Sequence, residues 1–108
     1  MVWIETNTGD GVLNDERIER IFCEPPNNLN QMFHIYAEIS GKTWLIYAGR
    51  IPTVITAQAK DKEITDEMSP QLIDWEIELF NKVMYFINNA KTKNNNQVIS
   101  LRDEFEKL

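Results

Sequence analysis

Apolar and polar positions follow their clearest pattern in two neighbouring stretches, residues 32–39 and 43–48, where β-branched and aromatic residues predominate. Residues 32–39 alternate between apolar and polar, which is typical of a strand with one buried face. The sequence between them predicts a type II′ turn centred on Gly41-Lys42, because glycine readily adopts the positive φ of the first central position. The resulting pairs on the predicted core face are Ile39–Trp44, Ala37–Ile46 and Ile35–Ala48.

All six residues of these pairs are apolar, and a slip of one residue would divide them between the two faces, which supports the register. The opposite face of this predicted hairpin carries two tyrosines. Tyrosine offers a large, rigid contact area with a polar tip, so the face is our candidate partner-binding surface. Its predicted residues are His34, Tyr36, Glu38, Leu45 and Tyr47. The alternative is that the tyrosines stack across the strands and only shield the backbone.

The N-terminal part reads as short strands separated by turn residues. We expect a strand at 2–6, a glycine turn at 7–11, a second strand from Val12, a short turn at 14–17 and a strand at 18–24. The last segment also fits one helical turn after an Asn14 cap, but its β-branched content and the following prolines favour a strand.

The longest helical signal starts at Ser69-Pro70, with serine as the expected N-cap and proline in the first helical position. We predict a helix over 70–89. Its apolar residues cover about 200° of arc, twice the stripe that one docking surface needs, so the helix must be covered on more than one side. The residues expected to meet the sheet are Ile73, Ile77, Phe80, Met84 and Ile87.

The remaining segments are weaker. Thr53–Thr56 is predicted as an edge strand after Pro52, and 58–68 as an exposed, charged connection. Residues 92–97 predict a polar linker. A last short helix is expected at 100–108, with Ser100 as cap and its apolar stripe lying over the excess arc of the long helix. That stripe is Leu101, Phe105 and Leu108.

Together these elements predict an α+β fold. One antiparallel sheet of four to five strands would carry the long amphipathic helix on one face, with a possible short C-terminal helix. Residues 1–90 would form a single domain and 91–108 a polar linker and C-terminal segment. A chain of 108 residues can bury an ordinary core without disulfides or metals.

Composition narrows the function classes. The net charge is −6, which argues against a non-specific nucleic-acid binder and leaves open a partner that is itself basic. A DNA mimic would need a nearly uninterrupted acidic run, which the sequence lacks. No apolar span is long enough for a membrane helix, and no leader pattern precedes the first strand. The single Cys23 gives no disulfide, so we expect a cytoplasmic protein that does not bind membranes.

Candidate chemistry is sparse. The chain has one histidine, one cysteine and none of the common hydrolase, zinc or phosphate-loop spacings, so we expect no enzyme, no catalytic or metal-ligating residues and no cofactor. A Cys23–His34 pair across adjacent strands is a conceivable nucleophilic arrangement without a third orienting group. Glu76 lies inside the apolar arc of the long helix. It either reaches solvent or pairs with an arginine such as Arg20 or Arg50, or it is a buried contact for a ligand.

The opening Trp3-Ile4-x-Thr6, the glycine turn, Val12-Leu13-Asn14, the hairpin and the long amphipathic helix resemble a pattern found in small uncharacterised bacterial and phage-borne proteins. Those proteins begin with W-I-x-T, continue as a β-meander and close with one helix. The chain departs from the pattern at 58–68 and in its asparagine-rich tail. The resemblance implies a fold and an origin, and it implies no activity.

Three functions remain open at this point. The leading one is a small, acidic, non-enzymatic interaction protein that binds a protein partner, such as an inhibitor or immunity-type protein from a phage or mobile element. The second is a homodimeric structural or accessory protein that uses the wide apolar arc of its helix. The third is a small-ligand or enzyme module built on Cys23, His34 and Glu76.

Overall fold

The computed structural model describes residues 1–93 and 96–106. The strands are β1 (Val2–Glu5), β2 (Val12–Asn14), β3 (Arg20–Glu24), β4 (Phe33–Ile39), β5 (Lys42–Gly49) and β6 (Gln97–Ile99), and the helical elements are the 3₁₀ turn η1 (Asp15–Arg17), α1 (Thr53–Thr56), α2 (Ser69–Thr92) and α3 (Leu101–Phe105). Part of the predicted linker, residues 94–95, and the end of the predicted last helix, with Leu108, lie outside the described residues.

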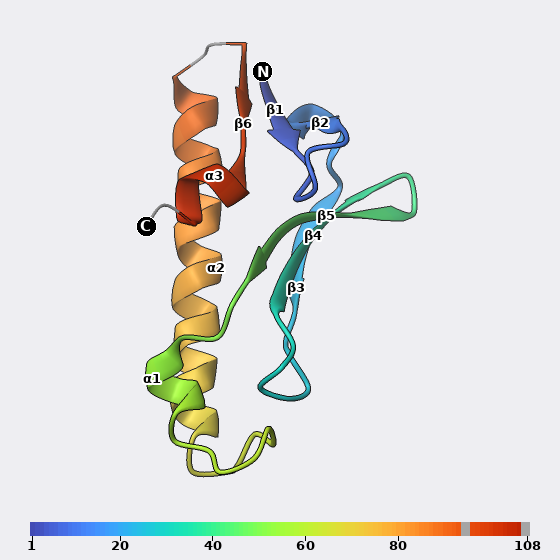
Figure 1. The fold of residues 1–108 in the computed structure, drawn as a ribbon. Helices are drawn as coiled ribbons and strands as arrows, with labels where there is room; N and C mark the ends of the chain where they lie inside the picture. Colours follow the sequence, from blue (N-terminus) through green and yellow to red (C-terminus); the bar gives the residue numbers. More distant parts are fainter. Residues whose placement is uncertain (94–95, 107–108) are drawn as a thin grey trace.

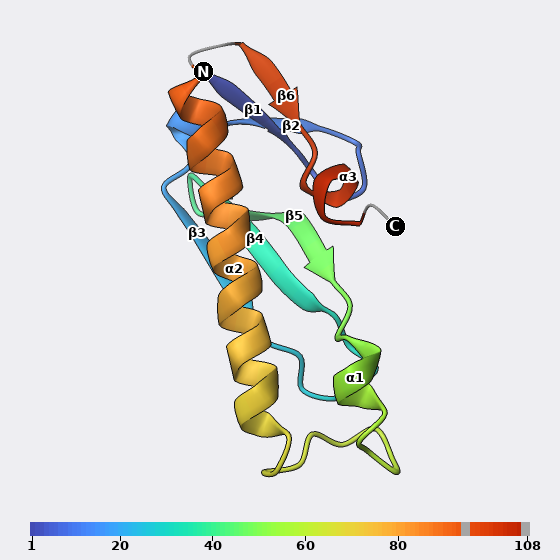
Figure 2. The same ribbon diagram turned by 90° about the vertical axis from the view of Figure 1, so that its left-hand side faces the viewer.

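The predicted α+β class, with one long helix packed against strands and a short C-terminal helix, is confirmed. The strands are divided between two three-stranded sheets, of order β2-β1-β6 and β3-β4-β5. Helix α2 runs the length of the molecule along one side of both sheets (Figures 1 and 2). The main core lies where α2 meets the two sheets, with Ile4, Phe33, Ile35, Val83 and Ile87 all nearly or fully buried. A smaller second cluster joins α1 to the start of α2.

The turn of the β4–β5 hairpin differs from the prediction by one residue. Its central residues are Ser40 and Gly41, with φ of 51° and 79°, and Ile39 pairs with Lys42. Two positive φ angles define a type I′ turn, whose twist suits a hairpin. The predicted II′ turn at Gly41-Lys42 is therefore wrong, and so are the pairs counted from it. The ladder also shifts between Ile35 and Tyr36, so that Ile46 is an extra, bulged residue.

Trp44 lies outside the core, contrary to the prediction. It pairs with Ala37, yet 42% of its surface is exposed, against the expectation that it fills the core. The tip of the β4–β5 hairpin extends away from α2 (Figure 1). Trp44 instead borders a hollow beside Trp3 and Val12. Ile46 and Tyr47 fill the core from β5, and Ala48, the partner of His34, is also buried.

Helix α2 faces the sheets with a side that overlaps the predicted one only in part. Ile87 is buried and Phe80 and Met84 are half-buried, but Ile73 and Ile77 are 50% and 55% exposed, so their predicted contact with the sheet is wrong. The buried positions of α2 are Leu72, Val83, Ile87 and Ala90. An arc of about 200° contains more than one possible docking stripe. Pattern alone therefore could not choose between them.

Two local predictions around α1 and α2 also fail. Thr53–Thr56 forms α1 rather than an edge strand, because the Pro52 carbonyl accepts from the Ile55 and Thr56 N–H groups and Ile55 is buried in the second cluster. The N-cap of α2 is Met68 rather than Ser69. Ser69 already lies inside the helix, and its N–H donates to the Thr65 carbonyl.

The C-terminal segment joins the fold directly. Strand β6 pairs in parallel with β1, with Val2 opposite Gln97 and Ile4 opposite Ile99. As predicted, the Ser100 hydroxyl caps α3, accepting from the Asp103 N–H at 3.2 Å. The Phe105 and Phe86 ring centroids are 5.8 Å apart and nearly perpendicular, so α3 does cover part of the excess apolar arc of α2, as predicted.

Candidate functional site

The side of the β3-β4-β5 sheet that faces away from α2 carries the residues predicted for partner binding. Ile21, Ile35 and Ala37 point to the helix, and Ile35 and Ala37 are fully buried in the core. Because side chains alternate along a strand, their neighbours share the opposite side, which none of the described helices covers (Figures 1 and 2). We call this side the outer sheet face; its residues are Arg20, Phe22, Glu24, His34, Tyr36, Glu38 and Leu45.

Three rings form a continuous row across the outer sheet face. The Phe22 and Tyr36 rings stack at 5.5 Å between centroids with an interplanar angle of 27°, and the His34 ring lies 5.9 Å from Tyr36. The Arg20 guanidinium sits over the Phe22 ring, 4.2 Å from its centroid. Its Nη2 also lies 3.2 Å from Oε2 of Glu38. The row is therefore held by stacking, a cation–π contact and an ion pair.

Four of the five residues predicted for this surface are brought together. His34, Tyr36 and Glu38 alternate along β4, and Leu45 is the direct partner of Tyr36 on β5. Tyr47 is the exception: it pairs with Ile35 on the helix side and is only 4% exposed. The bulged Ile46 turns Tyr47 toward the core, where its ring lies 5.8 Å from that of Phe105. The assignment of Tyr47 to the partner-binding surface is therefore wrong.

Sequence reasoning missed the contribution of β3 to this face. Phe22 pairs with Tyr36 and Arg20 with Glu38, so β3 supplies one end of the row. The signal was present in the predicted strand at 18–24, which alternates with the correct phase. The pairing of this strand with β4 could not be predicted, because residues 25–32 connect the two. A connection of that length does not define a turn type, so the pairs cannot be counted outward from it.

Cys23, His34 and Glu76, the residues of the enzyme hypothesis, do not converge. Cys23 pairs with Ile35 and faces α2, whereas His34 pairs with Glu24 on the outer sheet face. The sheet therefore separates the thiol from the imidazole. Glu76 of α2 lies on the side of Cys23: desolvation, and then the charge of Glu76, raise the pKa of the Cys23 thiol. A thiol held in its protonated form is a poor nucleophile.

Glu76 itself is half-buried and has its pKa raised by desolvation. Arg20 pairs with Glu38 on the other side of the sheet. Among the described residues, no arginine lies within ion-pair distance of Glu76. The expected pairing with Arg20 or Arg50 is therefore not made.

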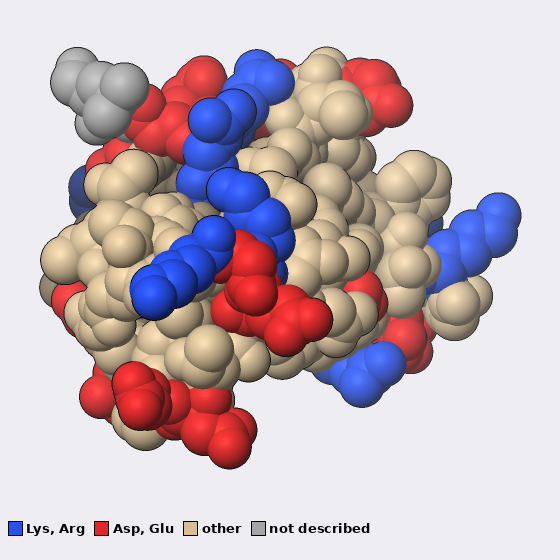
Figure 3. Space-filling view, turned by 60° about the horizontal axis from the view of Figure 1, so that its bottom comes forward, with Lys and Arg blue, Asp and Glu red and all other residues tan. Residues whose placement is uncertain are grey.

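Charges elsewhere are mixed. On the side of the molecule drawn in Figure 3, basic and acidic side chains lie interspersed between wide uncharged areas. Within the described ranges, no group of three or more His, Cys, Asp or Glu side chains is arranged to hold a metal ion. None of the described helices combines the length and hydrophobicity needed to cross a lipid bilayer.

The sequence and the fold were both compared with known proteins. No family model matches the chain, and no curated protein and no solved structure gives a significant match. The class of protein must therefore be argued from the geometry of the outer sheet face.

Proposed function

We propose that this chain is a small, non-enzymatic protein-binding protein whose outer sheet face contacts a protein partner. The observation that carries the proposal is the row of rings formed by Phe22, Tyr36 and His34 on an uncovered sheet face, with Arg20 stacked at its end. Tyrosine and arginine are the residues most enriched where interfaces gain their binding energy.

The row suits binding better than it suits folding. A cross-strand aromatic pair contributes only about 0.2–1 kcal/mol to a sheet, which a pair of threonines could partly replace. A partner, by contrast, would meet side chains already fixed by one another, because Arg20 is held by both Phe22 and Glu38. Fixed side chains lose less rotamer entropy on association, which favours affinity.

The partner that fits best carries a basic surface. The chain has a net charge of −6, and on the outer sheet face the two carboxylates of Glu24 and Glu38 outnumber the one cation, Arg20, which pairs with Glu38. Opposite charge speeds encounter and makes the association rate fall as salt rises. Small size and acidity are what motivate the finer proposal, an inhibitor or immunity-type protein of phage or mobile-element origin.

Photo-crosslinking in the organism that encodes the chain tests this proposal. A benzophenone amino acid placed at position 45, beside Tyr36, should yield one dominant crosslinked protein. That crosslink should disappear with Tyr36→Ala and persist with Tyr36→Phe, which keeps the ring. Val54→Ala, which removes an apolar side chain that is 65% exposed on α1, is the control and should leave the crosslink unchanged.

The effect of these substitutions on the crosslink shows whether the outer sheet face binds the partner. If Tyr36→Ala and Phe22→Ala both remain folded by circular dichroism and keep the crosslink at the wild-type level, the outer sheet face is not the binding surface.

A further inference from the structure

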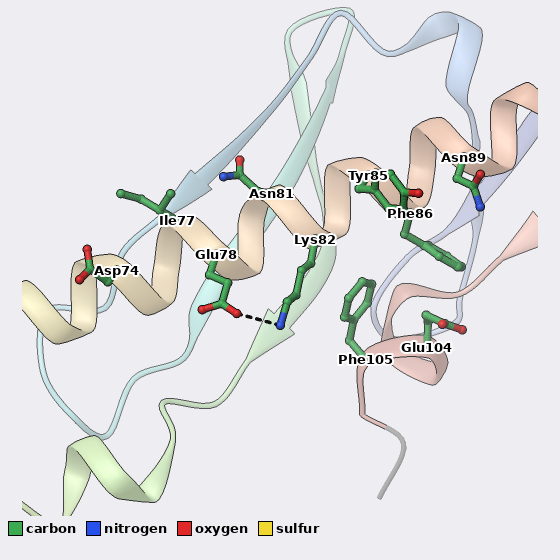
Figure 4. A pocket seen from close by; sticks show the side chains of 10 residues that line it. All are labelled: Asp74, Ile77, Glu78, Asn81, Lys82, Tyr85, Phe86, Asn89, Glu104 and Phe105. Carbon is green, nitrogen blue, oxygen red and sulfur yellow. Dashed lines mark ion pairs between the residues drawn. The ribbon is translucent and has the colours of Figure 1, made fainter.

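A groove of about 820 Å³ follows the side of α2 that faces away from the β3-β4-β5 sheet and ends against α3. Figure 4 shows Phe86 and Phe105 facing each other where the two helices meet. Ile77 and Tyr85 add to its apolar lining. This groove lies on helices, away from the outer sheet face, and is independent of the function proposed above.

The apolar residues along this groove are left open to solvent by the described chain. Ile77 is 55% and Tyr85 is 74% exposed. Ile73, which is 50% exposed, comes one helical turn before Ile77 and extends the same line. Asn81 lies between Ile77 and Tyr85 on the helix, so polar and apolar side chains alternate along this line. A grouping of exposed apolar residues with polar neighbours is a mark of an interaction surface.

The groove favours a helix as its occupant. An extended segment needs backbone partners for its N–H and C=O groups, and α2 has none to offer because its own groups are bonded within the helix. A helix brings its backbone bonds already made. It can pack its side-chain ridges against α2 at an ordinary interhelical distance of about 8–10 Å.

Charge selects the kind of helix. The rim of the groove carries the carboxylates of Asp74, Glu78 and Glu104 against one lysine, Lys82. Lys82 and Glu78 form an ion pair, with Nζ 3.0 Å from Oε1, and the rim as a whole keeps more carboxylates than ammonium groups. A second copy of this chain would bring another charge of −6 to an acidic rim, whereas a helix flanked by lysine or arginine would neutralise it.

We propose that this groove binds a basic amphipathic helix of a partner protein. The apolar stripe of that helix lies over Ile77, Tyr85 and Phe105. Its basic residues lie toward Asp74 and Glu78.

A displayed library of helical peptides of about 18 residues, or five turns, tests the proposal. The contact positions vary among apolar residues, and the flanking positions vary evenly among Lys, Glu and Gln. Selection uses the intact chain, with counter-selection on the double variant Ile77→Asn/Tyr85→Asn. Both side chains are more than half exposed, so this variant should keep its fold, and it leaves the charge unchanged. Val54→Asn is the matched control at an exposed apolar position outside the groove.

We expect the selected peptides to carry Lys rather than Glu at the flanking positions. They should bind the intact chain and the Val54→Asn control equally, and bind the double variant at least about tenfold more weakly. Glu78→Lys should weaken them further.

Peptides with no excess of Lys, or with equal affinity for the double variant, would overturn the proposal. Sedimentation showing a dimer at micromolar concentration that Ile77→Asn/Tyr85→Asn dissociates would also overturn it, by assigning the groove to a second copy.

Discussion

Replacing Phe33 by alanine should test the core more sharply than replacing Trp44, although the sequence pattern favoured Trp44. Phe33 is fully buried, and its ring packs edge-on against Trp75 with 5.8 Å between centroids. Burying a phenylalanine removes about 150–250 Å² from water. At about 25 cal/mol per Å² this is worth about 4–6 kcal/mol, an upper bound because the unfolded chain already hides part of that area.

We expect Phe33→Ala to lower the free energy of unfolding by about 3–5 kcal/mol, since the surrounding side chains close the cavity only in part. Trp44 leaves 42% of its surface in water, so Trp44→Ala should cost about 1–2 kcal/mol. Phe33→Leu, which keeps most of the volume, should cost less than about 1.5 kcal/mol and remain folded if the alanine variant does not.

Urea unfolding followed by far-ultraviolet circular dichroism measures these differences without relying on the tryptophans. With a slope of about 1–3 kcal/mol per molar urea, a loss of 3–5 kcal/mol moves the midpoint by about 2 M. The slope itself should stay constant between variants. A Trp44→Ala midpoint as low as that of Phe33→Ala would refute the assignment of these residues to surface and core.

Four further predictions concern Gly49, Asp15, Glu76 and Cys23. Gly49→Ala should lower the free energy of unfolding by about 1–3 kcal/mol in the same assay, because the added Cβ would come within 2.9 Å of the Leu79 side chain. The buried Asp15 Oδ1 accepts a hydrogen bond from the Val2 N–H at 2.8 Å. Asp15→Ala should therefore lower the free energy of unfolding by about 1–3 kcal/mol. Asp15→Asn should lower it clearly less, because the amide oxygen can accept the same bond. Burial raises the pKa of Glu76. The wild type should therefore lose stability relative to Glu76→Gln as pH rises through the folded-state pKa, and the two proteins should be about equally stable below the usual pKa of glutamate. A pH series of urea titrations checks this. The same variant should lower the pKa of Cys23, visible as faster alkylation of its thiol at mildly alkaline pH, and identical alkylation profiles would contradict this.

Local signals predicted much of the fold. The N-terminal order of strand, glycine turn, strand, short turn and strand matches β1, β2, η1 and β3. The Asn14 side chain accepts from the Glu16 N–H, a cap that the sequence suggested only for the helical alternative. The start of α2 lies within one residue of the prediction, and Ser100 caps α3 as expected. The Ser100 cap depends on residues close in sequence, where a side chain can satisfy a nearby backbone group. The start of α2 has no side-chain cap and follows from Pro70 in its first turn.

Register was the part that could not be predicted. Ser40-Gly41 and Gly41-Lys42 are both acceptable two-residue turns, and choosing between them moves the partner of each residue near the turn by two positions. The bulge at Ile46 then changes the phase again, which lets Ile46 and Tyr47 both be buried. A bulge has no distinctive residue here, so its position follows from the packing against α2.

The candidate site was predicted in part for the same reason. Residues of the outer sheet face on β4 were correct because strict alternation fixed them, whereas Tyr47 on β5 was wrong because it follows the bulge. Phe22 and Arg20 needed a long-range register. The open groove on α2 was not predicted, because Asp74, Glu78 and Lys82, which line it, lie outside the apolar arc of the helix.

The parallel pairing of β1 with β6 has a consequence for how the molecule comes into being. Strand β1 is made first, yet one of its two edges has no neighbour until residues 97–99 have left the ribosome. Contacts between residues so distant along the chain close slowly, because a long loop must be ordered before they form. A message cut short anywhere before those residues would therefore yield a polypeptide with an unsatisfied, aggregation-prone border at its N-terminus, which proteases and chaperones can recognise.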